Sequence, residues 1–254
     1  MSVFEVRTLS KHFTKDGQDL VALRGVDLAV EPGTFLVLLG RSGCGKSTLL
    51  NLMAGLTTAT GGEILYRGER LTGPRTQIGY LTQHDTLMPW RDVRRNVEMP
   101  MELRGDPAPG RAEAAQALIE RVGLAGYEKH YPRELSGGMR RRAGLARMLA
   151  GEPETLLLDE PFSALDAQLR TELQADLLRL WQGSGRTVVF VTHDIDEALL
   201  LADRVVVLGA LGRILLDLEV DLDRPRDLDE IRVDPHYVAQ HRELAATLKK
   251  AATA

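Results

Sequence analysis

A glycine-rich segment of eight residues constrains the fold most strongly. Residues 40–47, Gly-Arg-Ser-Gly-Cys-Gly-Lys-Ser, follow the pattern G-x-x-x-x-G-K-[ST]. They come directly after the apolar run 35–39 and before a helical run at 48–54. A loop of this kind turns its backbone N–H groups around a polyphosphate at the positive end of a helix, and its lysine adds a full charge. The order strand, loop, helix therefore predicts a phosphate-binding site beside a parallel sheet.

Two more short apolar runs end abruptly in polar residues. They are residues 156–158, before Asp159, and residues 187–191, before Thr192. Such runs are typical of buried parallel strands. Residues 111–122 instead place apolar side chains on one helical face. Strands that alternate with helices predict an α/β fold.

The pattern changes along the chain, although all of residues 1–254 are expected to form a single domain. About residues 3–31 combine extended segments with turn signals and predict a small antiparallel sheet. About residues 89–150 are expected to form a helical subdomain inserted between strands of the main sheet. A C-terminal tail of about residues 220–254 carries one more helix, which Asp234 is predicted to cap.

Composition excludes several classes of function. The formal net charge of −4 leaves no general basic surface for nucleic acid. Cys44 is the single cysteine, so no intrachain disulfide can form, and the first residues lack the pattern of a signal peptide. These features favour a reducing, cytoplasmic setting. No apolar run approaches the roughly 18 to 20 residues that span a bilayer, so any membrane role is expected to go through a partner.

An acidic pair follows the apolar run at 156–158. A carboxylate at Asp159 can reach the shell of a Mg²⁺ ion, and one at Glu160 can orient or deprotonate a water. An ordinary solvated strand end is the alternative, and the upstream phosphate loop is what makes the pair specific. The sequence predicts Asp159 and the Ser47 hydroxyl as Mg²⁺ ligands and Glu160 as the catalytic residue.

A third motif, Leu-Ser-Gly-Gly-Met, occupies residues 135–139 and precedes a helix whose apolar residues share one face. Ser136 is the predicted helix cap, and the glycines expose backbone N–H groups. An ordinary capped helix is the alternative. The motif lies about ninety residues after Lys46 and just before Asp159. This position between the other two motifs favours a functional role over an ordinary capped helix.

The three motifs in this order resemble those of the nucleotide-binding subunits of ABC transporters, whose signature Leu-Ser-Gly-Gly-Gln or Met matches residues 135–139. The resemblance covers about residues 1–240 and implies a P-loop NTPase core of the RecA-like type, with ATP and Mg²⁺ as cofactors. It also implies a head-to-tail dimer in which each ATP lies between one subunit's phosphate loop and the other's signature. Ser136, Gly137 and Gly138 would then contact the partner's nucleotide.

The resemblance assigns roles to further residues. Phe13 matches the aromatic residue that stacks on adenine, with an ordinary core aromatic as the alternative. Gln83 matches the glutamine that contacts Mg²⁺ or the attacking water, with a surface amide as the alternative. Asp166 ends the 163–166 segment, which resembles the loop along the dimer seam, and His193 matches the histidine that contacts the γ-phosphate. The nucleotide-binding set is Phe13, Gly40, Arg41, Ser42, Gly43, Cys44, Gly45, Lys46, Ser47 and Thr48.

Three residues depart from the common family pattern. Glutamine is usual where Arg141 stands, Gly144 costs about 1 kcal/mol against alanine inside a helix, and Thr155 replaces an apolar residue. The arginine run 140–142 is interpreted as a solvated, charged helix face, with nucleic-acid contact as a minor alternative.

Within the family, residues 87–90, 191–198 and 224–231, together with Met139, are similar to the nitrate, sulfonate and taurine importer group. The resemblance implies an ATP-hydrolysing subunit that energises import of such a small solute. Its partners would be a second ABC subunit, transmembrane permease subunits and, indirectly, a solute-binding protein, at the cytoplasmic face of the bacterial plasma membrane. The alternative is a soluble ABC ATPase without a transport role, a class that usually carries twin ATPase domains or coiled-coil insertions.

Overall fold

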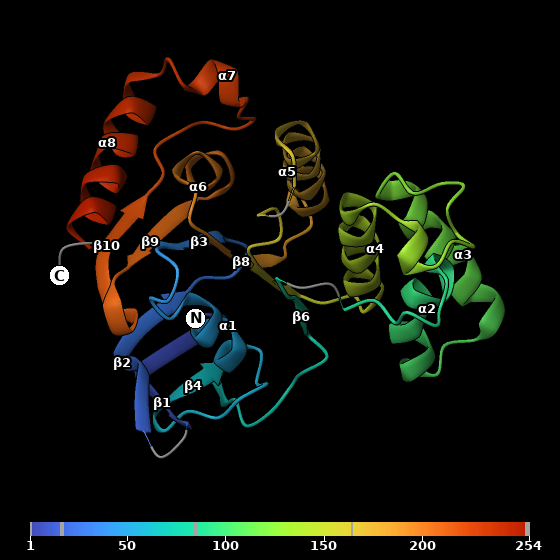
Figure 1. Cartoon of the computed structure of the whole chain (residues 1–254), viewed down its shortest axis with the longest axis horizontal. Coiled ribbons are helices and arrows are strands. Elements are labelled where there is room, and N and C mark those ends of the chain that lie inside the picture. Colours follow the sequence, from blue (N-terminus) through green and yellow to red (C-terminus); the bar gives the residue numbers. More distant parts are fainter. Residues whose placement is uncertain (1, 16–17, 84–85, 164, 252–254) are drawn as a thin grey trace. The chain divides into compact units, whose positions relative to one another are not determined.

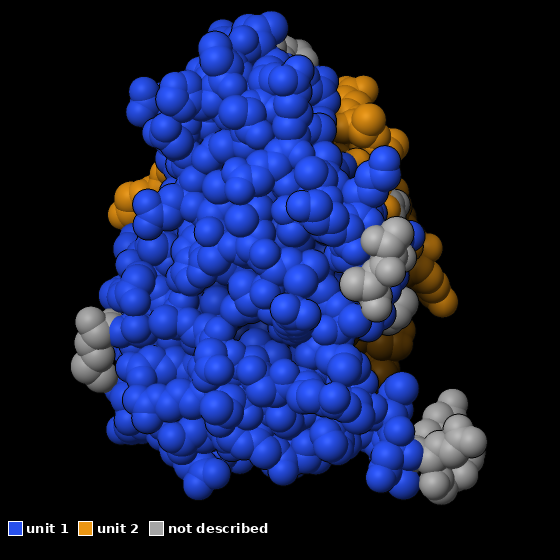
Figure 2. All heavy atoms as spheres, turned by 90° about the vertical axis from the view of Figure 1, so that its left-hand side faces the viewer, with its two compact units in different colours: residues 1–75, 185–254 blue, residues 76–184 orange. Residues whose placement is uncertain are grey.

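The computed structural model describes residues 2–15, 18–83, 86–163 and 165–251. The chain forms two compact units, one made of residues 1–75 and 185–254 and the other of residues 76–184 (Figure 2). Each unit is described by itself below, with the elements labelled as in Figure 1. None of the helices in the described ranges is long and apolar enough to cross a membrane.

The first unit contains an antiparallel sheet, which confirms the prediction for the N-terminal segment. Its strand order is β2-β1-β4-β5, and Phe4 lies opposite both Val30 and Tyr66. The Phe4 and Tyr66 rings are 5.0 Å apart, and Phe4 is fully buried, so this face packs as a core. The strands are β1 (Phe4–Lys15), β2 (Gln18–Val30), β4 (Gly61–Tyr66) and β5 (Glu69–Arg70).

The same unit carries the strands that present the phosphate loop. β3 (Phe35–Gly40) pairs in parallel with β8 (Thr187–Thr192) and with β9 (Arg204–Leu208), and β10 (Ile214–Glu219) runs antiparallel to β9. Every residue of β3 and β8 is buried, as their continuous apolar runs predict. Leu39 lies opposite Thr192, so the residues that follow these two strands emerge at one edge.

Four α-helices of the first unit are α1 (Lys46–Met53), α6 (Ile195–Leu201), α7 (Leu228–Ile231) and α8 (Pro235–Lys250). α8 begins as predicted, because the Asp234 carboxylate accepts a hydrogen bond from the His236 backbone N–H at 2.7 Å. The helix packs beside β9, β10 and α6 (Figure 1). It buries Tyr237 and Leu244 there.

The second unit has two parallel strands and a set of helices. Leu81 at the end of β6 pairs with Leu158 in β7, so the residues that follow both strands emerge at one edge. α2, α3 and α4 pack on one another (Figure 1). The elements are β6 (Ile78–Leu81), α2 (Val93–Arg104), α3 (Ala108–Arg121), α4 (Gly137–Ala150), β7 (Thr155–Asp159) and α5 (Ala167–Trp181). Strands and helices of both units confirm the α/β class.

Candidate functional site

Lys46 lies beneath the glycine-rich loop between β3 and α1. Its side chain is only 4% exposed, and its ammonium donates to the carbonyl oxygens of Gly40 at 2.7 Å and Arg41 at 2.9 Å. α1 starts after Gly45 with no side chain capping its N-terminus. The loop therefore combines a held positive charge with helix N–H groups directed at one point, which is the arrangement that binds phosphate.

The glycines of this loop are required by its backbone. Gly43 and Gly45 have φ values of +83° and +108°, which a side chain would strain. A Cβ at Gly40 would lie 2.7 Å from the Leu208 carbonyl oxygen and 2.8 Å from the Cys44 sulfur. Cys44 is buried at this contact, which agrees with its interpretation as a small filler.

His193 borders the same cavity as the loop. The cavity measures about 610 Å³, and its lining includes residues 41–44 and His193, together with Ala210 and Ala251. His193 is exposed at the corner between β8 and α6. That corner is fixed by Asp194, whose side chain caps α6 and whose backbone N–H donates to the Thr192 hydroxyl at 3.1 Å. The parallel pairing of β3 with β8 thus brings together residues about 150 positions apart in the sequence.

Phe13 is not a core aromatic, because its side chain is 39% exposed on β1. The buried Lys11 ammonium lies 4.8 Å from the centre of the Phe13 ring and donates to the Thr58 carbonyl oxygen at 2.7 Å. The cation–π contact holds the ring in place. This placement suits the predicted adenine-stacking role better than the alternative.

In the second unit, Asp159 is the last residue of β7 and Glu160 follows it directly, which places the acidic pair at the strand end as predicted. Asp159 is buried, and the Tyr80 hydroxyl lies 3.5 Å from its carboxylate. Burial, followed by the Asp159 charge and this hydrogen bond, raises the pKa of Tyr80 well above its usual value. Tyr80 therefore stays neutral and donates to Asp159 throughout the physiological range.

Glu160 has a left-handed backbone, with φ of +42°. This conformation strains a residue with a side chain and is common at functional sites. The Glu160 carboxylate lies 3.5 Å from the side-chain nitrogen of Gln83, which is exposed just after β6. Gln83 and the acidic pair Asp159 and Glu160, predicted from two separate motifs, thus lie at one edge of the second unit.

The signature residues lie at the start of α4. Ser136 caps the helix, accepting a hydrogen bond from the Met139 backbone N–H at 3.2 Å. Gly137 is exposed, whereas Gly138 is buried, and a Cβ on Gly138 would collide with the Leu169 side chain. The cap was predicted, but the packing role of Gly138 was not.

Asp166 also has a structural task in the segment that the resemblance places at the dimer seam. Its side chain caps α5, accepting a hydrogen bond from the Leu169 backbone N–H at 3.0 Å. Ala164, inside the same segment, lies outside the described residues.

The arginine run 140–142 is not the solvated face that the sequence favours. Arg140 donates to the Leu135 carbonyl oxygen at 2.6 Å, and Arg142 forms an ion pair with Glu172 at 3.0 Å. Arg141 donates to the carbonyl oxygens of Thr82 and Gln83. No local pattern could reveal these last contacts, because the partners lie almost sixty residues upstream.

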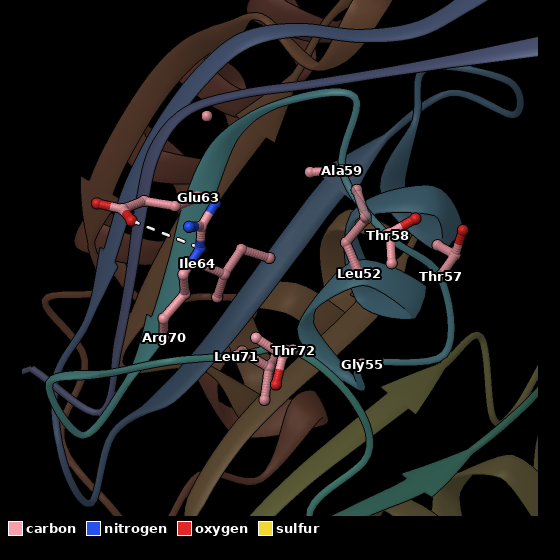
Figure 3. Close-up of a pocket in the computed structure, with 11 residues that line it drawn as sticks. Leu52, Gly55, Thr57, Thr58, Ala59, Glu63, Ile64, Arg70, Leu71 and Thr72 are labelled. Atoms are coloured by element: carbon pink, nitrogen blue, oxygen red, sulfur yellow. Dashed lines mark ion pairs between the residues drawn. The ribbon is translucent and has the colours of Figure 1, made fainter.

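A second cavity, of about 200 Å³, lies beside α1, β4 and β5 in the first unit (Figure 3). Its lining includes Thr57, Thr58 and Thr72, and its two charged side chains, Glu63 and Arg70, form an ion pair at 3.8 Å. None of the phosphate-loop residues lines it. With its charges already paired, this cavity is a poor candidate for the nucleotide.

Comparisons with known proteins agree with the motifs. The model of the ABC transporter family matches residues 23–163. An uncharacterised ABC transporter ATP-binding protein of Methanocaldococcus jannaschii is 49% identical, over 89% of this chain and 85% of that protein. The taurine import ATP-binding protein of Escherichia coli K12 is 43% identical, over 90% of this chain and 91% of that protein.

Two further comparisons extend this picture. The nitrate import ATP-binding protein of Synechococcus elongatus is 45% identical over 92% of this chain, which spans only 36% of that longer protein. A solved dimeric ATP-binding cassette, in a post-hydrolysis state with ADP and Pi, matches with a TM-score of 0.79 at 28% identity. That match covers 87% of this chain and 100% of the cassette. The chain therefore belongs to the ABC transporter family, as one of its ATP-binding, ATP-hydrolysing proteins.

Proposed function

We propose that this protein binds ATP with its phosphate loop, hydrolyses it within a dimer and thereby drives import of a small solute. The observation that carries the proposal is the cavity that loop residues 41–44 share with His193, next to the uncapped start of α1, whose first residue is the buried Lys46. A glycine-rich loop at an uncapped helix N-terminus, with a lysine beside it, favours a polyphosphate over other ligands.

The donor atoms fit Mg²⁺. No cluster of three or more His, Cys, Asp or Glu side chains that could hold a metal occurs among the described residues. Ser47, Asp159 and Gln83 instead offer a hydroxyl, one carboxylate and one amide, and Mg²⁺ is commonly held by few protein oxygens plus substrate phosphates. When bound, the ion would neutralise charge on the β- and γ-phosphates.

The remaining side chains suit hydrolysis. Glu160 would take a proton from the attacking water, and Gln83, beside it, would orient that water. His193 would contact the γ-phosphate and hold it in line. Lys46 would hold the β- and γ-phosphates. Lys46 and His193 belong to one unit, and Gln83 and Glu160 belong to the other. The family relationship supports the proposal that all four act on the same nucleotide.

The dimer proposal is supported by the signature at the start of α4. Ser136 and Gly137 are exposed at a helix N-terminus, which suits contact with a phosphate of the partner's ATP. The similar solved cassette is a dimer. Asp166 would lie along the seam. Each of two equivalent sites would then combine one phosphate loop with the other subunit's signature.

The transport proposal is supported by the names of similar proteins and by exposed apolar side chains on the surface. Two similar proteins are named for nitrate and taurine import, so we infer nitrate, a sulfonate, taurine or a related solute as cargo. Trp90 and Leu103 are 71% and 81% exposed, which is unusual for large apolar side chains and suits docking of a permease at a helical subdomain of about residues 89–150. The protein would act at the cytoplasmic face of the membrane, with a solute-binding protein as an indirect partner.

The test is ATP hydrolysis and size-exclusion chromatography of the wild type, Glu160→Gln and Glu113→Gln in ATP and Mg²⁺. Removing a general base costs about 10²- to 10⁴-fold in rate, so Glu160→Gln should lose hydrolysis and elute as a dimer that retains ATP. Glu113→Gln is the matched control, because Glu113 is an exposed glutamate on α3, and it should behave as the wild type.

Either of two outcomes would contradict this proposal. One is a Glu160→Gln variant that hydrolyses ATP at the wild-type rate, because Glu160 would then not be the base. The other is a Glu160→Gln variant that binds ATP but stays a monomer at every protein concentration, because the composite site would then not form.

A further inference from the structure

Two arginines of α4 hold the backbone of the segment that contains Gln83. Arg141 donates one guanidinium nitrogen to the Thr82 carbonyl oxygen at 2.5 Å and the other to the Gln83 carbonyl oxygen. Arg147 donates to the Thr86 carbonyl oxygen at 2.7 Å and to its hydroxyl. Residues 84 and 85 lie outside the described part of the chain. The signature helix is thus tied directly to the segment after β6.

The Arg141 contact depends on the shape of guanidinium. Its planar fork presents two donors in a fixed geometry, so one side chain spans two successive carbonyl groups. Lysine has one charged nitrogen and cannot hold both carbonyls in the same way. Arg141 also borders an apolar cavity lined by Leu81 and Leu145, and its bond to the Thr82 carbonyl oxygen is partly buried, which strengthens that charge-assisted bond.

A continuous path within residues 76–184 leads from the signature to the candidate base. Ser136 caps α4, and Arg141 lies five residues later on the same helix. Arg141 holds the backbone of Gln83, and the Gln83 side chain lies 3.5 Å from the Glu160 carboxylate. A shift of α4 would therefore displace Gln83 relative to Glu160.

We propose that Arg141 is a positioning residue that transmits the contact between the signature and a nucleotide to Gln83 and Glu160. This inference rests on the proposed function. In the dimer, Ser136 would touch the partner's ATP, whereas Gln83 and Glu160 would serve the ATP of their own subunit. Arg141 would then couple the two ATP sites, with an arginine where the family commonly has glutamine.

The test compares Arg141→Met, Arg141→Lys and Arg142→Met in steady-state ATP hydrolysis. Misplacing a catalytic group by about 1 Å costs up to about a hundredfold in rate, so Arg141→Met should lower kcat at least about tenfold. KM for ATP should change little, because the phosphate loop and Phe13 are unaltered, and the Hill coefficient should fall towards one. Arg141→Lys should recover only part of kcat.

Arg142→Met is the matched control, since it removes the neighbouring arginine of the same helix, whose partner is the half-exposed Glu172. It should keep wild-type kcat and cooperativity. A general destabilisation of α4 would lower kcat equally in both variants. An equal loss of kcat in Arg141→Met and Arg142→Met therefore overturns the proposal.

A second readout does not require catalysis. Hydrogen–deuterium exchange at Thr82 and Gln83 without nucleotide should be faster in Arg141→Met than in the wild type, and unchanged in Arg142→Met. Unchanged exchange in Arg141→Met overturns the proposal, as does a kcat equal to that of the wild type. If the wild type itself failed to hydrolyse ATP, the proposed function would fail, and the exchange result would still decide whether Arg141 holds this segment.

Discussion

At the scale of single residues, two adjacent signature glycines have different tasks. Gly138 is in contact with Leu169, so Gly138→Ala forces this side chain to move, and we expect a loss of about 1 to 3 kcal/mol in the free energy of unfolding. Gly137 is exposed, and a Cβ added there would lie 3.9 Å from the Arg140 side chain, an ordinary contact distance. Gly137→Ala should leave stability within about 1 kcal/mol of the wild type but lower ATP hydrolysis, because a methyl group would obstruct a close phosphate.

Urea unfolding and ATP hydrolysis of the two variants check this division. Each glycine serves as the control for the other, because both changes add one methyl group at neighbouring positions. Equal losses of stability, or full activity in Gly137→Ala, would contradict it.

The sequence predicts individual residues where a short motif fixes the chemistry. Lys46, Asp159, Ser136 and His193 all lie at the ends of the strands and helices that their flanking residues indicate. The tasks of Arg141 and Gly138 were missed, because their partners lie 58 and 31 residues away in the sequence. Contacts of that kind depend on how helices pack, and no local pattern encodes them.

At the scale of elements, apolar periodicity predicts which segments form strands and helices, but not which polar groups are buried between them. The short continuous apolar runs of β3, β7 and β8 predict buried strands, and all three segments are fully buried strands. In α8 the two buried residues are Leu244, which is apolar, and Tyr237, which carries a hydroxyl. The Tyr237 hydroxyl donates to the Asp196 carboxylate on α6 at 2.5 Å.

The contact between α6 and α8 predicts a pH dependence of stability. Burial alone would raise the pKa of Asp196, but hydrogen bonds from Tyr237 and Arg232, with the charges of Arg232 and His241, lower it below its usual 3.8. Burial, followed by Asp196, raises the pKa of Tyr237 to about 12. The stability that Asp196 contributes is fully present above its pKa in the unfolded chain, and it is lost as pH falls through its lower pKa in the folded protein. The Tyr237 contribution is present below pH 10 and is lost towards pH 12.

Tyr237→Phe should therefore lower the free energy of unfolding by about 1.5 to 3 kcal/mol at pH 7, the value of a hydrogen bond to a charged group. The difference from the wild type should shrink below about pH 4 and above about pH 10. Denaturant unfolding across pH measures it. Tyr127→Phe, at an exposed tyrosine, should change stability by less than about 0.5 kcal/mol. A Tyr237→Phe difference that is constant with pH would show that Asp196 is not its cause.

At the scale of the whole molecule, a head-to-tail dimer makes a prediction that a single-chain site does not. Lys46→Ala disables the phosphate loop, and Ser136→Arg obstructs the signature, so each variant alone should be inactive. In a mixed dimer, one site would carry both changes, while the other would combine the intact phosphate loop of one chain with the intact signature of the other. Random mixing makes half of the dimers mixed, so about a quarter of the wild-type sites should be restored.

The matched control mixes Lys46→Ala with Glu160→Gln. If Lys46 and Glu160 of one chain serve the same nucleotide, each site in this mixed dimer carries one of the two changes, and no activity should return. Recovery in the control but not in the first mixture would place the signature in the same half-site as Lys46, and would remove the reason for a path through Arg141. The recovered activity in the first mixture should stay below this quarter of sites, because coupling of the two sites through Arg141 makes one intact site work poorly beside a disabled one.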